Sequence, residues 1–277
     1  MPQILKMESV TQKIKRNLKD GTFFKNVPVA LKNRLIKRVI TSNLIYYFDK
    51  ERVLTKRYQS DINRLNSNYI KVGNYYLDSR IPITKKSIVY SLGIGSDISF
   101  DLYIQNNFGC EIFMCDPTPA SITFMKNYKS NKFLKYEPIG VWIENTTLRF
   151  YEPQFGGSAS VMKDEKTGEY FDAKCLTMAT IMRQNKHDEI SIFKADIEGA
   201  ALPILDQMVQ NKIFPDQIVV EFERPRKNMS KIQGFFDDLS NLRSKLDKMG
   251  YEESLLPRKE SKYYSLEMLF VQRNKIQ

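Results

Sequence analysis

The stretch VYSLGIGSD, residues Val89 to Asp97, decides the fold that the rest of the sequence builds. A short apolar, β-branched run from Ser87 to Leu92 predicts a strand, and Gly93 and Gly95 follow it directly. Glycines in this place can bring backbone N–H groups close to a ligand at the start of the next helix. The alternative is that they only form a turn. The third glycine of a dinucleotide fingerprint is replaced by Ile98, which argues against a bound pyrophosphate.

A carboxylate follows the next strand along the chain. The run Glu111 to Cys115 predicts that strand, and Asp116 and Pro117 come at its end. A carboxylate there can accept hydrogen bonds from both ribose hydroxyls of an adenosine cofactor. An Asp that caps a turn before Pro117 is the alternative. The glycines and Asp116 together, in a βαβ setting, favour a nucleoside-cofactor site.

Strands and helices alternate after residue 86, and this alternation predicts a parallel sheet with right-handed crossovers. Two extended runs joined by a turn close the chain and predict an antiparallel last strand. The expected fold class is α/β, with a Rossmann-like, seven-stranded, mostly parallel sheet, an antiparallel last strand and a helical N-terminal extension. Strands are expected at residues 87–92, 111–115, 138–142, 147–151, 191–195, 217–222, 251–255 and 265–271, and helices at 97–108, 120–128, 201–210 and 230–249.

Acidic residues follow two neighbouring strands of this sheet. In KADIEGAALPIL, residues 194–205, Asp196 and Glu198 come directly after a strand, and Glu223 ends the acidic run of the next one. Ligands of open α/β sheets bind at this carboxyl edge. One carboxylate can therefore take a proton from an attacking hydroxyl, or Asp196 and Glu223 can hold Mg²⁺. Helix caps and loop salt bridges are the alternative for each acid singly.

The order of these motifs resembles that of FkbM-type methyltransferases, a family of class I, S-adenosylmethionine-dependent enzymes. VYSLGIGSD is similar to the family's glycine motif, CDPTP (115–119) to its acid-Pro element, and KADIEGAALPIL to its Lys-x-Asp-x-Glu-Gly signature. The segment at residues 140–141 and the run GGSAS (156–160) also fit. A closing strand pair of the expected kind likewise belongs to the seven-stranded methyltransferase sheet.

The resemblance implies methyl transfer from S-adenosylmethionine to an oxygen nucleophile, such as a hydroxyl of a sugar, a glycan or another small molecule. Asp196 and Glu198 are then expected at the reacting centre with Glu223 in support, and Mg²⁺ is an optional ligand of Asp196 and Glu223. The sequence departs from the family at Asp97, where a glycine is common. The residues expected at the cofactor are Gly93, Gly95, Ser96, Asp97, Asp116, Pro117, Gly140 and Val141.

Positive charge is concentrated near the N-terminus. Residues 1–58 hold fourteen Lys or Arg and four Asp or Glu, a net +10 of the chain's +11. Within them, residues 29–48 carry an apolar stripe at helical spacing, which predicts a basic amphipathic helix. Residues 1–80 are expected to form a mainly helical extension of a catalytic domain at 81–277, and to meet an anionic membrane surface or another polyanion. A solvated helical face is the alternative.

Two other functions fit parts of this pattern. A nucleic-acid methyltransferase would use the basic extension as an electrostatic clamp, although the aromatic residues there do not interleave regularly with the basic ones, so nucleic acid is the less favoured partner. A non-catalytic scaffold that docks on membrane through residues 29–48 would bind lipid but no cofactor. The two predict steeply salt-dependent RNA binding and cofactor-free lipid binding, respectively.

Composition favours a cytoplasmic protein, peripheral to a membrane at most. Residues 1–20 lack the uninterrupted apolar core of a signal peptide, and no stretch approaches the ~20 apolar residues of a membrane span. The three cysteines, Cys110, Cys115 and Cys175, have no metal-ligand spacing and are expected to be reduced and buried.

Overall fold

The computed structural model describes residues 50–63, 68–153, 167–225, 228–257 and 264–277. The chain divides into two compact units, residues 1–58 and 59–277. The described part of the first unit is residues 50–58, which belong to helix α4 (Lys50–Ser60). The predicted basic helix at 29–48 and the run GGSAS lie outside the described residues and stay predictions. No helix within the described ranges is long and apolar enough to cross a membrane.

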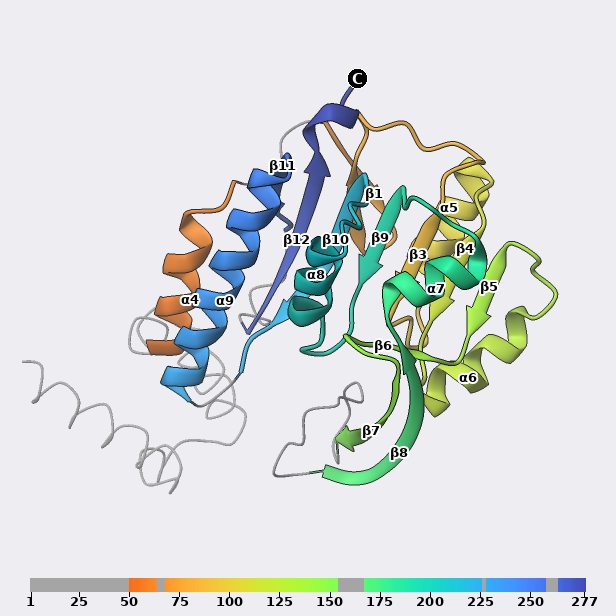
Figure 1. Cartoon of the computed structure of the whole chain (residues 1–277), viewed down its shortest axis with the longest axis horizontal. Helices are drawn as coiled ribbons and strands as arrows, with labels where there is room; N and C mark the ends of the chain where they lie inside the picture. Colours follow the sequence, from red (N-terminus) through yellow and green to blue (C-terminus); the bar gives the residue numbers. More distant parts are fainter. Residues whose placement is uncertain (1–49, 64–67, 154–166, 226–227, 258–263) are drawn as a thin grey trace, which may run out of the picture. The chain divides into compact units, whose positions relative to one another are not determined.

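A seven-stranded sheet organises residues 59–277 (Figure 1). Its strands are β3 (Val89–Leu92), β4 (Ile112–Cys115), β5 (Leu134–Glu137), β9 (Ile192–Ala195), β10 (Gln217–Glu223), β11 (Tyr251–Leu255) and β12 (Ser265–Gln272), in the order β11-β12-β10-β9-β3-β4-β5. The pairs from β10 to β5 are parallel, whereas β12 is antiparallel to both β10 and β11. The predicted α/β fold with an antiparallel last strand is confirmed.

Local sequence signals set the ends of the helices between these strands. The Thr118 side chain accepts a hydrogen bond from the backbone N–H of Ser121 and so caps the next helix, and Pro119 stands at its first turn. Gly109 ends the helix after β3 in the left-handed conformation, at φ +72°. The helices are α5 (Ser99–Phe108), α6 (Pro119–Met125), α7 (Met178–Asn185), α8 (Ala201–Gln210) and α9 (Met229–Lys248).

The central strands carry the core. Every residue of β3 and of β9 is buried, as expected of parallel strands covered by helices on both faces. Ile112 and Met114 of β4 are fully buried, and Val219 of β10 packs in the same cluster. The three cysteines are free and buried, as predicted.

The third strand of the main sheet was predicted at the wrong residues. The apolar run at 138–142 was expected to supply it, but β5 precedes that run and residues 140–141 form the short strand β6 (Gly140–Val141). Since β5 lies at the edge of the sheet and is only partly buried, its polar sequence LKYE suits the position. β6 instead joins β7 (Thr146–Pro153) and β8 (Thr167–Leu176) in a smaller sheet. Figure 1 shows this sheet at the end toward which β5 and β9 point.

An unpredicted hairpin precedes the main sheet. Strands β1 (Tyr69–Val72) and β2 (Tyr75–Asp78) pair antiparallel across a two-residue turn, within a stretch that was assigned to the helical extension. Val72 is fully buried in the main core. The backbone N–H of Asp78 donates to Oε1 of Gln217 at the start of β10, at 2.8 Å. The hairpin is therefore part of the compact unit that contains the sheet.

We expect Phe270→Ala to lower the free energy of unfolding by about 3–5 kcal/mol, because it removes a large side chain from a core position on β12. Phe270 is 1% exposed and packs edge-on against Phe222 with 6.5 Å between ring centroids. Urea unfolding measures the loss. Ile122→Ala, on the exposed side of α6, is the control and should change stability by less than about 0.5 kcal/mol. Equal losses for the two variants would contradict the placement of β12 within the sheet.

Candidate functional site

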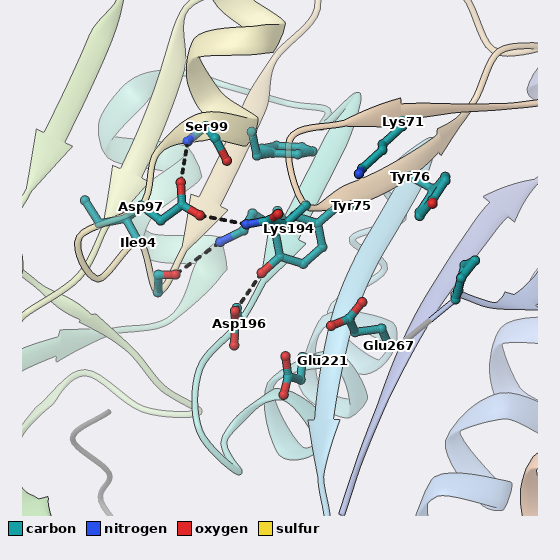
Figure 2. Close-up of a pocket in the computed structure, with 14 residues that line it drawn as sticks. Lys71, Tyr75, Tyr76, Ile94, Asp97, Ser99, Lys194, Asp196, Glu221 and Glu267 are labelled. Carbon is teal, nitrogen blue, oxygen red and sulfur yellow. Dashed lines mark hydrogen bonds between the residues drawn. The ribbon is translucent and has the colours of Figure 1, made fainter. Parts of the chain in front are cut away.

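A cavity of about 430 Å³ opens at the carboxyl ends of β3, β9 and β10 (Figure 2). Its wall is formed by the loop after β3, the loop after β9, the first turn of α5 and the β1–β2 hairpin. The predicted site residues that line it are Gly93, Asp97 and Asp196. Glu221 of β10 and Glu267 of β12 line it farther along the sheet.

Gly93 stands where two loops touch. A Cβ at this position would lie 1.8 Å from the backbone carbonyl oxygen of Asp196, and Gly93 also has φ +69°. The backbone N–H of Asp196 donates to the carbonyl of Leu92 at 3.0 Å, and that of Gly93 donates to the carbonyl of Cys115 at 3.1 Å. Only glycine fits here, because any side chain would separate the loop after β3 from the loop after β9.

Asp116 fixes the glycine loop from the other side. Its Oδ2 accepts a hydrogen bond from the backbone N–H of Gly95 at 2.9 Å. Its Oδ1 accepts from the backbone N–H and the hydroxyl of Thr118, at 2.9 and 2.7 Å. The side chain is buried, and Asp116 and Pro117 do not line the cavity. The structure therefore shows Asp116 as the residue that holds the loop in shape.

Asp196 accepts a short hydrogen bond from the hairpin. The hydroxyl of Tyr75 donates to its Oδ2 at 2.6 Å, and Figure 2 shows the two side chains pointing toward each other and joined by this bond. Burial, followed by the negative charge of Asp196, raises the pKa of Tyr75 well above its usual range. Tyr75 therefore keeps its proton at neutral pH and acts as a donor to the carboxylate.

Asp97 closes the glycine loop. Its Oδ1 accepts from the backbone N–H of Ser99 at 2.9 Å, which orders the start of α5. Its Oδ2 accepts from Nδ2 of Asn74, in the hairpin turn, at 2.7 Å. The departure from the family's usual glycine at this position thus supplies a carboxylate that links the loop to the hairpin. Ser96, the residue before it, is exposed.

A buried lysine lies beneath the loop. Nζ of Lys194 donates to the backbone carbonyl of Gly93 at 3.1 Å and lies 5.1 Å from the centre of the Tyr75 ring. Asp101 of α5 is fully buried, and its carboxylate has no hydrogen-bond partner among the described residues. Burial raises the pKa of Asp101, and the positive charge of Lys194 opposes that shift. Burying this carboxylate is therefore costly, and Lys194 offsets part of that cost.

Two further carboxylates face each other in the cavity. Glu221 and Glu267 are direct partners in the antiparallel pairing of β10 with β12. Opposed like charges on neighbouring strands are unfavourable by themselves. With Asp97 and Asp196 they make four carboxylates against the two lysines Lys71 and Lys194, so the lining carries a formal excess of negative charge.

Eight of the eleven predicted residues lie outside this lining: Gly95, Ser96, Asp116, Pro117, Gly140, Val141, Glu198 and Glu223. Glu198 and Glu223 follow the correct strands but do not line the cavity. Gly140 and Val141 form β6, and a Cβ at Gly140 would lie 2.6 Å from Sγ of Cys175. Gly140 is therefore a packing position in the smaller sheet, as far as the described structure shows.

The tentative magnesium site receives no support. Among the described residues, no group of three or more His, Cys, Asp or Glu side chains converges in a way that could hold a metal ion. Asp196 instead accepts a hydrogen bond from Tyr75.

The hairpin residues at the cavity were missed in the sequence. Lys71, Asn74, Tyr75 and Tyr76 all line it, within the stretch YIKVGNYYLD. A Gly-Asn pair between two Tyr-rich, alternating runs is a two-residue hairpin signal that could have been recognised. Their closeness to Asp196 could not, because it depends on how the hairpin packs against the sheet.

The strand order and the carboxyl-edge cavity define a Rossmann-like methyltransferase architecture, and the sequence then specifies the family. Residues 84–253 match the methyltransferase FkbM domain, which is more than half of the chain. The chain belongs to the FkbM methyltransferase family. Among curated proteins, none is significantly similar to this chain.

Solved methyltransferases are similar to this chain only remotely. A precorrin-6Y C5,15-methyltransferase of Geobacter metallireducens is 10% identical, with 76% of this chain and 94% of that chain covered and a TM-score of 0.36. The fibrillarin of Aeropyrum pernix, solved with natively bound S-adenosyl-L-methionine, is 11% identical, with 69% and 68% covered and a TM-score of 0.39. The fibrillarin of Methanococcus jannaschii is 8% identical, with 74% and 81% covered and a TM-score of 0.41.

We expect Asp101→Asn to stabilise the protein at neutral pH. Because burial raises the folded-state pKa of Asp101, the folded protein binds this proton more tightly than the unfolded chain does. The penalty is absent below the unfolded pKa of about 3.9, grows as the pH rises from there to the raised folded pKa, and is constant above it. Thermal unfolding from pH 4 to pH 8 should show a smaller loss of stability with rising pH in the variant.

If Asp101→Asn is the less stable protein at neutral pH, the attraction between Asp101 and Lys194 outweighs the cost of burying the carboxylate. Asp237→Asn, on the exposed face of α9, is a matched control and should leave the pH dependence unchanged.

Proposed function

We propose that this chain transfers the methyl group of S-adenosylmethionine to a hydroxyl oxygen of a small-molecule acceptor, with sugars and glycans as the first acceptor class to test. One observation carries the proposal. A single cavity joins the glycine loop after β3 to the carboxylate of Asp196 after β9. A cofactor site and a proton acceptor therefore share one space, as a transfer to a hydroxyl requires.

The residues present suit this cofactor. Gly95 has φ +52°, and the space where its Cβ would project is empty within 4 Å, so the loop leaves room for a ligand against its backbone. S-Adenosylmethionine supplies an activated methyl group on a positively charged sulfur. An excess of carboxylates in the lining favours a ligand with sulfonium and ammonium groups. Gly93, Ile94 and Asp97 would contact it.

Asp196 is the proposed general base. Of the predicted catalytic acids it alone lines the cavity, within the described structure. Tyr75 donates to Oδ2 and so fixes the orientation of the carboxylate, and the other oxygen, Oδ1, is assigned the proton. The acceptor's proton passes to Asp196 while its oxygen bonds to the methyl carbon and the sulfur–carbon bond breaks. Alignment of the reactants contributes about 7–11 kcal/mol, and a general base adds about 10²- to 10⁴-fold in rate.

We expect the protein to bind S-adenosylmethionine saturably, and Asp116→Ala to weaken this binding at least about tenfold. The substitution removes hydrogen bonds from a carboxylate that holds Gly95 and Thr118 in place, each of a kind worth about 1.5–3 kcal/mol. Calorimetric titration measures both affinities.

Glu111→Gln is the control for this titration, because Glu111 is exposed and lies at the opposite end of the same strand. It should bind like the wild type. A folded wild-type protein that does not bind S-adenosylmethionine would overturn the proposed function and favour a docking scaffold.

We expect Asp196→Asn to lower the rate of methyl transfer about 10²- to 10⁴-fold while cofactor affinity changes by less than about threefold. The asparagine keeps the shape of the side chain and still accepts from Tyr75, but it cannot take a proton. Single-turnover transfer of a radiolabelled methyl group to a panel of sugars measures the rate. A variant as fast as the wild type would mean that another group is the base.

The acceptor panel also tests the alternative function. Structured RNA is included beside the sugars, at low and high salt. Transfer to RNA with a steep salt dependence, and none to sugars, would replace the small-molecule acceptor by a nucleic acid.

A further inference from the structure

The hairpin β1–β2 lies outside the part of the chain that matches the FkbM domain, residues 84–253, yet it forms one wall of the cavity. We propose that this hairpin is the roof of the cofactor site and that the amino-acid end of S-adenosylmethionine binds beneath it. The inference rests on the proposed function, because it names further residues of the same site. It extends the site to residues that precede the family domain.

The hairpin turn fits closely against the start of α5. Gly73 has φ +57°, and a Cβ there would lie 2.6 Å from the backbone nitrogen of Phe100. Tyr75 packs edge-on against the Phe100 ring, with 5.7 Å between centroids. Because the backbone of Gly73 packs directly against the backbone of α5, the position of the turn is fixed, and it lies beside the glycine loop.

Two polar contacts join the hairpin to the loops after β3 and β9. Asn74 donates to Asp97 at the end of the glycine loop, and Tyr75 donates to Asp196 after β9. Figure 2 shows both contacts around the same space. Each contact reaches one of the two loops that meet at Gly93, so the roof spans both loops that line the proposed cofactor site.

The far end of the hairpin is anchored independently of these contacts. The Tyr69 hydroxyl is 2.8 Å from Oγ of Ser254, and Asp78 exchanges hydrogen bonds with Gln217, at 2.8 and 3.3 Å. A substitution at the turn can therefore loosen the roof while the base of the hairpin stays attached to β10 and β11.

The charges of the roof and loop are complementary to an amino acid. Lys71 is an exposed lysine of the hairpin that lines the cavity, whereas Lys194 is buried with its Nζ on backbone carbonyls. Lys71 can pair with the carboxylate of the cofactor's amino-acid end, and Asp97 can pair with its ammonium group. This assigns the roof to that end of the cofactor.

The test is calorimetric titration of S-adenosylmethionine into glycine variants of the hairpin and of α5. Gly73→Ala forces the turn away from Phe100 and should raise the Kd about tenfold or more. Gly109→Ala is the matched control: it has the same kind of backbone strain, at φ +72°, but its Cβ would come no closer than 3.7 Å to a neighbour. It should bind within about twofold of the wild type. A folded Gly73→Ala protein with wild-type affinity would overturn the proposal.

A second pair of variants covers the case in which Gly73→Ala does not fold. Tyr75→Phe keeps the ring against Phe100 and Lys194 and removes the bond to Asp196. We expect the Kd to rise about three- to tenfold, whereas Tyr69→Phe, which also loses one hydroxyl from the hairpin, should leave it unchanged. Equal affinities for the two variants and the wild type would refute the roof.

Hydrogen exchange adds a readout that a purely structural hairpin would not change. Backbone amides of residues 69–78 should exchange more slowly when saturating S-adenosylmethionine is added, and those of β11 should not. Unchanged exchange in a protein that binds the cofactor would contradict the role of the hairpin but not the proposed function. A wild-type protein that binds no cofactor contradicts the proposed function instead, so the two failures are distinguishable.

Discussion

The close approach of two backbones at Gly93 is the constraint on which the site depends. A Cβ there would stand 1.8 Å from the carbonyl oxygen of Asp196, so the loops after β3 and β9 touch without an intervening side chain. Parallel pairing of Leu92 with Ala195 brings the two strands to this point in register. The backbone geometry alone thus places Asp196, the proposed general base. Asp196 can move only if the glycine loop moves with it.

Charge is distributed around that contact in two layers. Lys194 lies below the loop and binds its carbonyls, with the buried Asp101 as its counter-charge. Above the loop, the cavity is lined by carboxylates from four separate elements of the chain. The lower layer fixes the position of the loop, because Nζ of Lys194 donates to the backbone carbonyls of Leu92 and Gly93. The upper layer raises the local affinity for cations, which suits a sulfonium donor. After transfer the sulfur is a neutral thioether, so the carboxylates attract the product less strongly than the donor.

Much of this was readable from the sequence, and the misses have physical causes. The strand at Val89 and the acid at Asp196 follow from apolar runs that end in glycine or carboxylate, because buried parallel strands must be apolar and their carboxyl ends must meet. The edge strand β5 was missed because an edge needs little apolar sequence. Glu223 was expected in the site because it ends the strand. It lies on the same face of β10 as Glu221, two residues farther along, but only Glu221 lines the cavity.

The hairpin shows what a family signature leaves open. Residues 84–253, which match the family domain, include the glycine loop, Asp116 and Asp196. The contacts that close the space come from Asn74 and Tyr75, which local sequence could place in a turn but not against the loops. Tyr75 donates to Asp196, the proposed proton acceptor, so under the proposed function the shape of the hairpin also limits which hydroxyl could reach that carboxylate. The proposed function therefore gives acceptor selectivity a physical origin outside residues 84–253, in a turn that fits against α5 through Gly73.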